Sequence, residues 1–200
     1  ESKHEIKDFD IFAFTLQYEM SYTNIINMIN LSGLPIYSKN RNEKDPLIIA
    51  GGSTVYNPEP IAPFIDLFFI GEAEDGIVDL IRKYDSLKDS GLKRKDILLQ
   101  LSKIAGVYLP SLYTVSYHDT GELKAITAED GVKDEIKRQV VKNLDQAFYP
   151  TDFIVPYMSI VHDRAVLEIS RGCTRGCRFC AAGITYRPVR ERKPETLISL

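Results

Sequence analysis

Cysteine is scarce in this chain, tryptophan is absent, and histidine occurs only three times among 200 residues. The three cysteines cannot all pair in disulfides, so the sequence favours a reducing cytoplasm over a secreted, disulfide-stabilised class. No apolar run is long enough to cross a membrane, and we expect no membrane partner. The chain begins with Glu1 rather than Met, and its last helical segment has no cap, so we expect a piece of a longer protein.

Positive charge is concentrated towards the C-terminus. Residues 164–200 hold eight Lys and Arg against three acidic residues, although the whole chain has a net charge of −3. A basic environment stabilises thiolates and attracts anionic groups. A solvated face and an RNA contact remain open alternatives, because these charges form no dense stripe.

Three nearly continuous apolar runs predict strands that are buried on both faces, at 11–16, 47–50 and 67–70. Apolar residues repeat at helical spacing after the first run, over 22–29, and after the third run, over 77–84. Strands that alternate with helices in this way are typical of a parallel sheet. The sequence therefore predicts part of a doubly wound, Rossmann-type α/β domain.

The second half of the chain is less regular. We expect the following elements there: a helix at 97–104, a strand at 107–109, hairpin strands at 113–117 and 123–127, a short strand at 139–141, and a strand at 165–169. The polar stretch 132–156 resembles a connector between domains. We therefore divide the chain into an α/β domain at 1–105, a linker with a β-hairpin at 106–163, and the start of another domain at 164–200.

All three cysteines lie within eight residues, at Cys173, Cys177 and Cys180, with the spacing Cys-x-x-x-Cys-x-x-Cys. Soft thiolates this close together are typical ligands of an iron–sulfur cluster or of zinc. Zinc needs a fourth ligand, which only His162, His118 or His4 could supply. The sequence therefore predicts a metal centre, with a cluster favoured over zinc.

At these cysteines, and at the aromatic Phe179 before the last of them, the chain resembles the radical S-adenosylmethionine (SAM) superfamily. The resemblance implies a 4Fe–4S cluster held by Cys173, Cys177 and Cys180, with the fourth iron left for SAM. It also implies an enzyme that generates a 5′-deoxyadenosyl radical, an electron donor such as flavodoxin or ferredoxin, and a (β/α) barrel whose first strand precedes the cysteines. The substrate and any general acid or base are not identified, and RNA is one candidate substrate.

A second resemblance concerns the α/β domain. Gly51 and Gly52 after a strand, Asp66 before the next strand, and Gly71-Glu72 ahead of a helix are similar to the last third of a cobalamin-binding-type domain. This resemblance implies that Gly51, Gly52 and Glu72 line a cofactor site. The Asp-x-His-x-x-Gly motif of cobalamin ligation is absent from the sequence, and a glycine pair also forms ordinary tight turns. Bound cobalamin therefore remains an open question.

An alternative of another class is also open. The cysteines could belong to an electron-transfer module or a zinc-binding module that performs no radical chemistry. The formation of 5′-deoxyadenosine separates these alternatives from a radical enzyme.

Overall fold

The computed structural model describes residues 3–159, 161, 164 and 166–200. The chain divides into two compact units, Glu1–Val140 and Val141–Leu200. The predicted hairpin therefore belongs to the first unit, together with the α/β domain.

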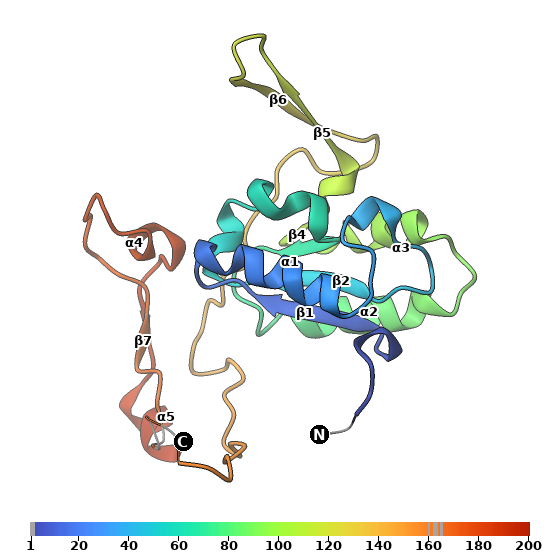
Figure 1. Cartoon of the computed structure of the whole chain (residues 1–200). Helices are drawn as coiled ribbons and strands as arrows, with labels where there is room; N and C mark the ends of the chain where they lie inside the picture. The colour runs from blue at the N-terminus through green and yellow to red at the C-terminus, as the bar shows by residue number, and fades with distance from the viewer. Residues whose placement is uncertain (1–2, 160, 162–163, 165) are drawn as a thin grey trace. The chain divides into compact units, whose positions relative to one another are not determined.

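The first unit is built on a four-stranded sheet with the order β1-β2-β3-β4 (Figure 1). Its strands are β1 (Ile11–Thr15), β2 (Leu47–Gly51), β3 (Leu67–Phe69) and β4 (Val107–Tyr108). β1, β2 and β3 are parallel, and β4 is antiparallel to β3. The predicted α/β class is confirmed, and the short antiparallel edge strand makes the sheet mixed rather than wholly parallel.

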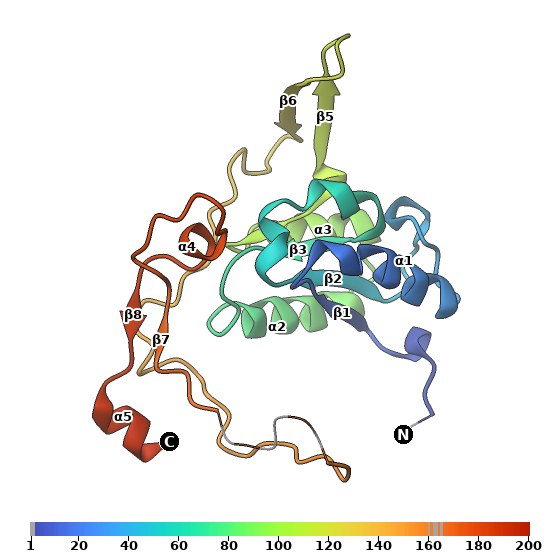
Figure 2. The ribbon, with the colours of Figure 1, turned by 60° about the vertical axis from the view of Figure 1, so that its left-hand side comes forward.

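Helices cover both faces of this sheet, as Figures 1 and 2 show: α1 (Tyr22–Leu31), α2 (Ile77–Lys88) and α3 (Arg94–Leu101). Ile48 on β2 packs with residues of α1 in one core, whereas its neighbour Ile49 packs with residues of α2 and α3 in a second core. Successive side chains of a strand point to opposite faces, so a strand covered on both sides is apolar throughout. This explains the continuous apolar runs in the sequence.

The predicted hairpin is present as β5 (Tyr113–Tyr117) and β6 (Leu123–Ala128), which are antiparallel. The short strand predicted at 139–141 is reduced to one parallel bridge between Gln139 and Gly71. Gln139 donates its backbone N–H to Ile70 O and accepts from Glu72 N, so this segment extends the end of β3.

The second unit contains β7 (Ser170–Arg171), α4 (Ala182–Thr185), β8 (Arg190–Glu191) and α5 (Pro194–Ser199). The strand predicted at 165–169 is wrong over Val166–Ile169, which form no strand, while Ala165 lies outside the described residues. Val166 and Ile169 are 62% and 63% exposed, and Ile169 has one backbone hydrogen bond to the neighbouring segment, accepted by its O from Arg192 N at 2.9 Å. The paired strand itself is β7, which is antiparallel to β8, so the described residues do not show the predicted first barrel strand.

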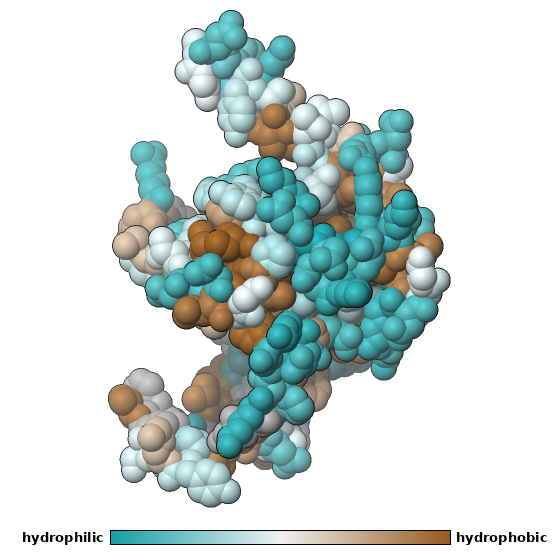
Figure 3. Space-filling view, turned by 45° about the vertical axis from the view of Figure 1, so that its right-hand side comes forward, coloured by the Kyte–Doolittle hydropathy of each residue, from teal (hydrophilic) through white to brown (hydrophobic). Residues whose placement is uncertain are grey.

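Some apolar side chains of the first unit lie outside its two cores. Met20, Met28 and Leu31, on α1 or just before it, are 71%, 45% and 76% exposed. Figure 3 shows apolar residues gathered in a patch among polar ones on one face of the molecule. Among the described residues, no helix combines the length and the apolar character of a membrane span.

A buried carboxylate fastens the first unit together. Asp66 Oδ2 accepts hydrogen bonds from Arg41 Nη1 at 2.9 Å, Arg94 Nη2 at 3.0 Å and Ile48 N at 2.8 Å. The two arginines also donate to the backbone carbonyls of Pro35, Ile36, Asn42, Asp45, Pro46 and Phe64. Burial lowers the pKa of Arg41 below its usual value, and the adjacent Asp66 opposes that shift. We call Arg41, Asp66 and Arg94 the arginine–aspartate cluster.

Substitution of Asp66 is expected to destabilise the first unit strongly. The side chain of Asp66 is 2% exposed, so Asp66→Asn leaves two guanidinium groups next to a neutral amide. Removing one partner from a buried ion pair costs about 3–5 kcal/mol. Urea denaturation followed by circular dichroism measures this loss in free energy of unfolding.

Asp10→Asn is the matched control, because Asp10 pairs with Lys88 at 3.0 Å and its side chain is 62% exposed. An exposed pair of this kind contributes less than about 1 kcal/mol. Equal losses in the two variants would contradict the structural role of the arginine–aspartate cluster.

Candidate metal centre

The three cysteines lie on the loop between β7 and α4 in the second unit. All three are free thiols; Cys173 and Cys180 are half-buried, and Cys177 is exposed. A thiol must be unpaired and reachable to bind a metal as thiolate. The loop meets both requirements.

The start of this loop is fixed by close packing at Gly172. Its φ is +101°, and an added Cβ would lie 2.7 Å from the backbone oxygens of both Tyr186 and Pro188. Only glycine fits this position without displacing backbone. Arg187 Nη2 donates to Arg175 O at 3.1 Å, and this hydrogen bond is a second contact between the loop and the 186–189 segment. Gly176, in contrast, has nothing within 4 Å of an added Cβ.

The sulfur atoms are not gathered around one point. Arg175 N donates to Cys173 Sγ at 3.4 Å, and Cys180 N donates to Cys177 O at 3.2 Å. Within the described part of the chain, no group of three or more His, Cys, Asp or Glu side chains is close enough to hold a metal. The donor set of three free thiols fits a cluster held by three thiolates, and the loop would have to close around it.

Histidine does not complete a metal site in the described residues, where neither His4 nor His118 joins such a group. His118 lies at the turn between β5 and β6. His162, the other histidine considered as a zinc ligand, lies outside the described residues.

Charged side chains fix the strand that leads into the loop. Arg171 donates to Glu168 through Nε at 2.8 Å and Nη2 at 2.9 Å. Arg192 Nη2 lies 3.6 Å from Glu168 Oε2, and Nη1 of the same guanidinium donates to Leu144 O. The guanidinium of Arg171 is therefore engaged by a carboxylate, while Arg175 and Arg178 are exposed. The net positive charge at the loop comes from the latter two.

Phe179, expected at the cofactor from the resemblance, is 93% exposed. Its ring precedes Cys180, at the end of the loop where α4 begins. A cofactor bound beside the cysteines could therefore reach the ring without displacing core residues.

The glycines of the α/β domain are packed against the chain itself. Gly52 has a φ of +106°, and an added Cβ would lie 2.6 Å from Leu16 O. Gly71 has a φ of +109°, and its added Cβ would lie 2.2 Å from Gln139 O. Gly51 is less restricted, with Phe69 O at 3.8 Å. Glu72 is half-buried and donates its backbone N–H to Gln139 O.

Because Leu16 and Gln139 fill the space at Gly52 and Gly71, these glycines do not fit the role of making room for a cobalamin tail. They allow two segments of backbone to approach each other closely.

Sequence reasoning missed the residues that position the cysteine loop from a distance. The 186–189 segment encloses Gly172, and Arg192 reaches Glu168 across the β7–β8 pair. Gly172, next to the first cysteine, was the sequence signal that indicates close backbone packing at this point. The residues that pack against Gly172 form no recognisable motif, because they contact it through backbone atoms.

The comparisons with known proteins address the first unit and the chain as a whole. The sequence profile described as "Radical SAM proteins, N-terminal" matches residues 1–110. An uncharacterized protein of Methanocaldococcus jannaschii is 31% identical over 201 residues, covering 100% of this chain and 36% of that protein. The chain thus spans about a third of the length of this curated relative.

No solved structure matches the chain. The family profile covers more than half of the 200 residues, and it does so at the end of the chain that lacks the cysteines. On this match, the chain belongs to the radical SAM proteins and contains their N-terminal region.

Proposed function

We propose that this chain carries the cluster-binding loop of a radical SAM enzyme, in which Cys173, Cys177 and Cys180 hold a 4Fe–4S cluster. The observation that carries the proposal is the set of three free thiols on one loop. The first residue of this loop, Gly172, is fixed by close backbone packing. The family match at 1–110 and the cysteine motif at 173–180 share no residue, so two separate stretches support the same superfamily.

Three thiolates on a four-iron cluster leave one iron free to bind SAM. When bound, such a cluster supplies the electron that cleaves the sulfonium of SAM reductively into methionine and a 5′-deoxyadenosyl radical. The chain's own contribution is to bind and to orient. The exposed Arg175 and Arg178 add positive charge beside the cysteines, which attracts an anionic ligand.

The Glu168 carboxylate acts at a distance from the thiols. It binds Arg171 and lies near Arg192, so it joins the strand before the loop to the strand after it. A loop anchored at both ends loses less conformational freedom when a ligand binds, which favours binding. Glu168 is thus assigned a positioning role.

Replacement of all three cysteines by alanine is expected to abolish cluster binding. Anaerobic reconstitution of the unaltered chain with iron and sulfide should give a visible charge-transfer absorption and about four irons per chain. The triple variant should give neither, because no thiolate remains to hold iron. Tightly bound zinc in place of iron in the unaltered chain would instead support the zinc-binding alternative.

Gly172→Ala is expected to lower the iron content several-fold, because the added Cβ forces the loop away from the Tyr186 and Pro188 carbonyls. Gly176→Ala is the matched control on the same loop and should load iron normally, since its Cβ meets nothing within 4 Å. Iron analysis and the electron paramagnetic resonance spectrum of the reduced cluster measure the outcome. Equal loading of the two variants would show that Gly172 does not position the cysteines.

Radical chemistry is tested on the full-length protein. Incubation with dithionite and SAM should yield 5′-deoxyadenosine, detected by chromatography, and the triple Cys→Ala variant should yield none. A reconstituted cluster that is reduced by dithionite but produces no 5′-deoxyadenosine would favour the electron-transfer alternative.

A further inference from the structure

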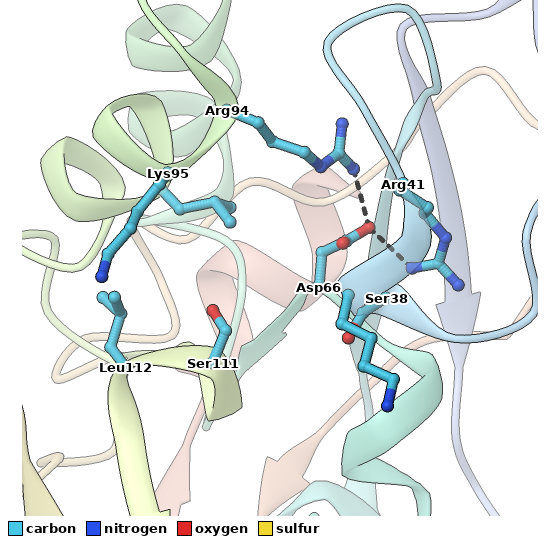
Figure 4. A pocket seen from close by; sticks show the side chains of 9 residues that line it. Ser38, Arg41, Asp66, Arg94, Lys95, Ser111 and Leu112 are labelled. Atoms are coloured by element: carbon cyan, nitrogen blue, oxygen red, sulfur yellow. Dashed lines mark hydrogen bonds and ion pairs between the residues drawn. The ribbon is translucent and has the colours of Figure 1, made fainter.

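A cavity of about 280 Å³ lies beside the arginine–aspartate cluster in the first unit (Figure 4). Asp66 directly precedes β3, and Ser111 follows β4, which runs in the opposite direction. The cavity therefore lies at the amino edge of the parallel strands. Gly51 and Gly52 lie at the carboxyl ends of the strands, so this cavity is separate from the site that the sequence suggested.

The lining of this cavity has an excess of positive charge. Four cationic side chains, those of Lys39, Arg41, Arg94 and Lys95, line the cavity together with one carboxylate, that of Asp66. Figure 4 shows Asp66 between the two arginines, which share it. The single negative charge does not balance them.

The two lysines are weakly neutralised. Lys95 forms an ion pair with Glu129 at 3.0 Å, but the two side chains are 68% and 43% exposed. An exposed pair of this kind is weak and easily exchanged. Lys39 lies 5.8 Å from the centre of the Tyr37 ring, and no carboxylate in the described residues pairs with it. A negatively charged ligand would be attracted to this cavity.

Several hydrogen-bond donors that line the cavity also have no acceptor in the described part of the protein. Within the described part of the chain, the hydroxyl groups of Ser38 and Ser111 make no hydrogen bond, and the buried Arg94 Nε has no acceptor. Donors without acceptors fit a ligand that is rich in acceptor oxygens. Leu98 and Leu112 supply an apolar wall that suits a carbon skeleton.

We propose that this cavity binds the phosphate group of a small organic phosphate. A phosphate monoester carries nearly two negative charges and three acceptor oxygens. These match the charges of the two lysines and the donors that have no acceptor, namely Arg94 Nε and the two serine hydroxyls. A carboxylate offers one charge and two oxygens, and it matches less well. The volume of about 280 Å³ is near the lower end for small-molecule sites, so it leaves room for the carbon part beside the leucines.

Isothermal titration calorimetry with three probes tests the proposal: glycerol phosphate, inorganic phosphate and succinate. We expect saturable binding of glycerol phosphate, tighter than that of inorganic phosphate and tighter than that of succinate, whose two charges lie on separate carboxylates. Added sodium chloride should weaken the binding, because the attraction is electrostatic. Binding of inorganic phosphate alone, or of succinate as tightly as glycerol phosphate, would overturn the proposal.

Lys39→Ala and Ser111→Ala should each weaken glycerol phosphate binding, the former by roughly five- to tenfold because it removes a charged donor. Both side chains are exposed or at the rim of the cavity, and circular dichroism checks that the variants are folded. Lys124→Ala on β6 is the control, since Lys124 does not line the cavity and the variant removes the same charge. Equal affinities in Lys39→Ala and Lys124→Ala would place the ligand elsewhere.

Discussion

The buried carboxylate of Asp66 is the interaction on which the first unit depends. One of its oxygen atoms, Oδ2, accepts hydrogen bonds from β2, from the segment that leads into β2, and from the start of α3. A buried charge is tolerated only when it is paired and hydrogen-bonded, so each of these segments must reach its place for the others to be stable. The same requirement concentrates cationic groups at the amino edge of the strands and gives the neighbouring cavity its charge.

Close approach of backbone segments is the second constraint. Gly52 lies against Leu16, and Gly71 lies against Gln139, at distances that leave no room for a side chain. In the second unit, Gly172 lies in the same way against the 186–189 segment, at the entrance to the cysteine loop. The glycines at the carboxyl ends of β2 and β3 thus hold the sheet together, whereas Gly172 positions the residues that are proposed to bind the cluster.

Three features were predictable from the sequence because they are local. Strands buried on both faces need continuous apolar residues, a hairpin needs a tight turn such as the one ending at Gly121, and the spacing of the three cysteines on one loop is a property of the sequence itself. The α/β class and the β5–β6 hairpin were therefore predicted correctly. The strand at Val166–Ile169 was predicted from its apolar pattern alone, and this prediction was wrong. A strand also needs a neighbouring strand to pair with, and the apolar pattern of one segment does not show whether such a neighbour exists.

The sequence by itself determined which segments are apolar, where glycine permits a tight turn, and that three free thiols share one short loop. Only the tertiary structure decided which residues meet across long distances in the chain, such as Arg94 with Asp66, or Tyr186 and Pro188 with Gly172. The physical reason is that periodicity and ligand spacing act over a few residues. The partners of a buried charge or of a crowded glycine are instead chosen by packing, which depends on the whole unit at once.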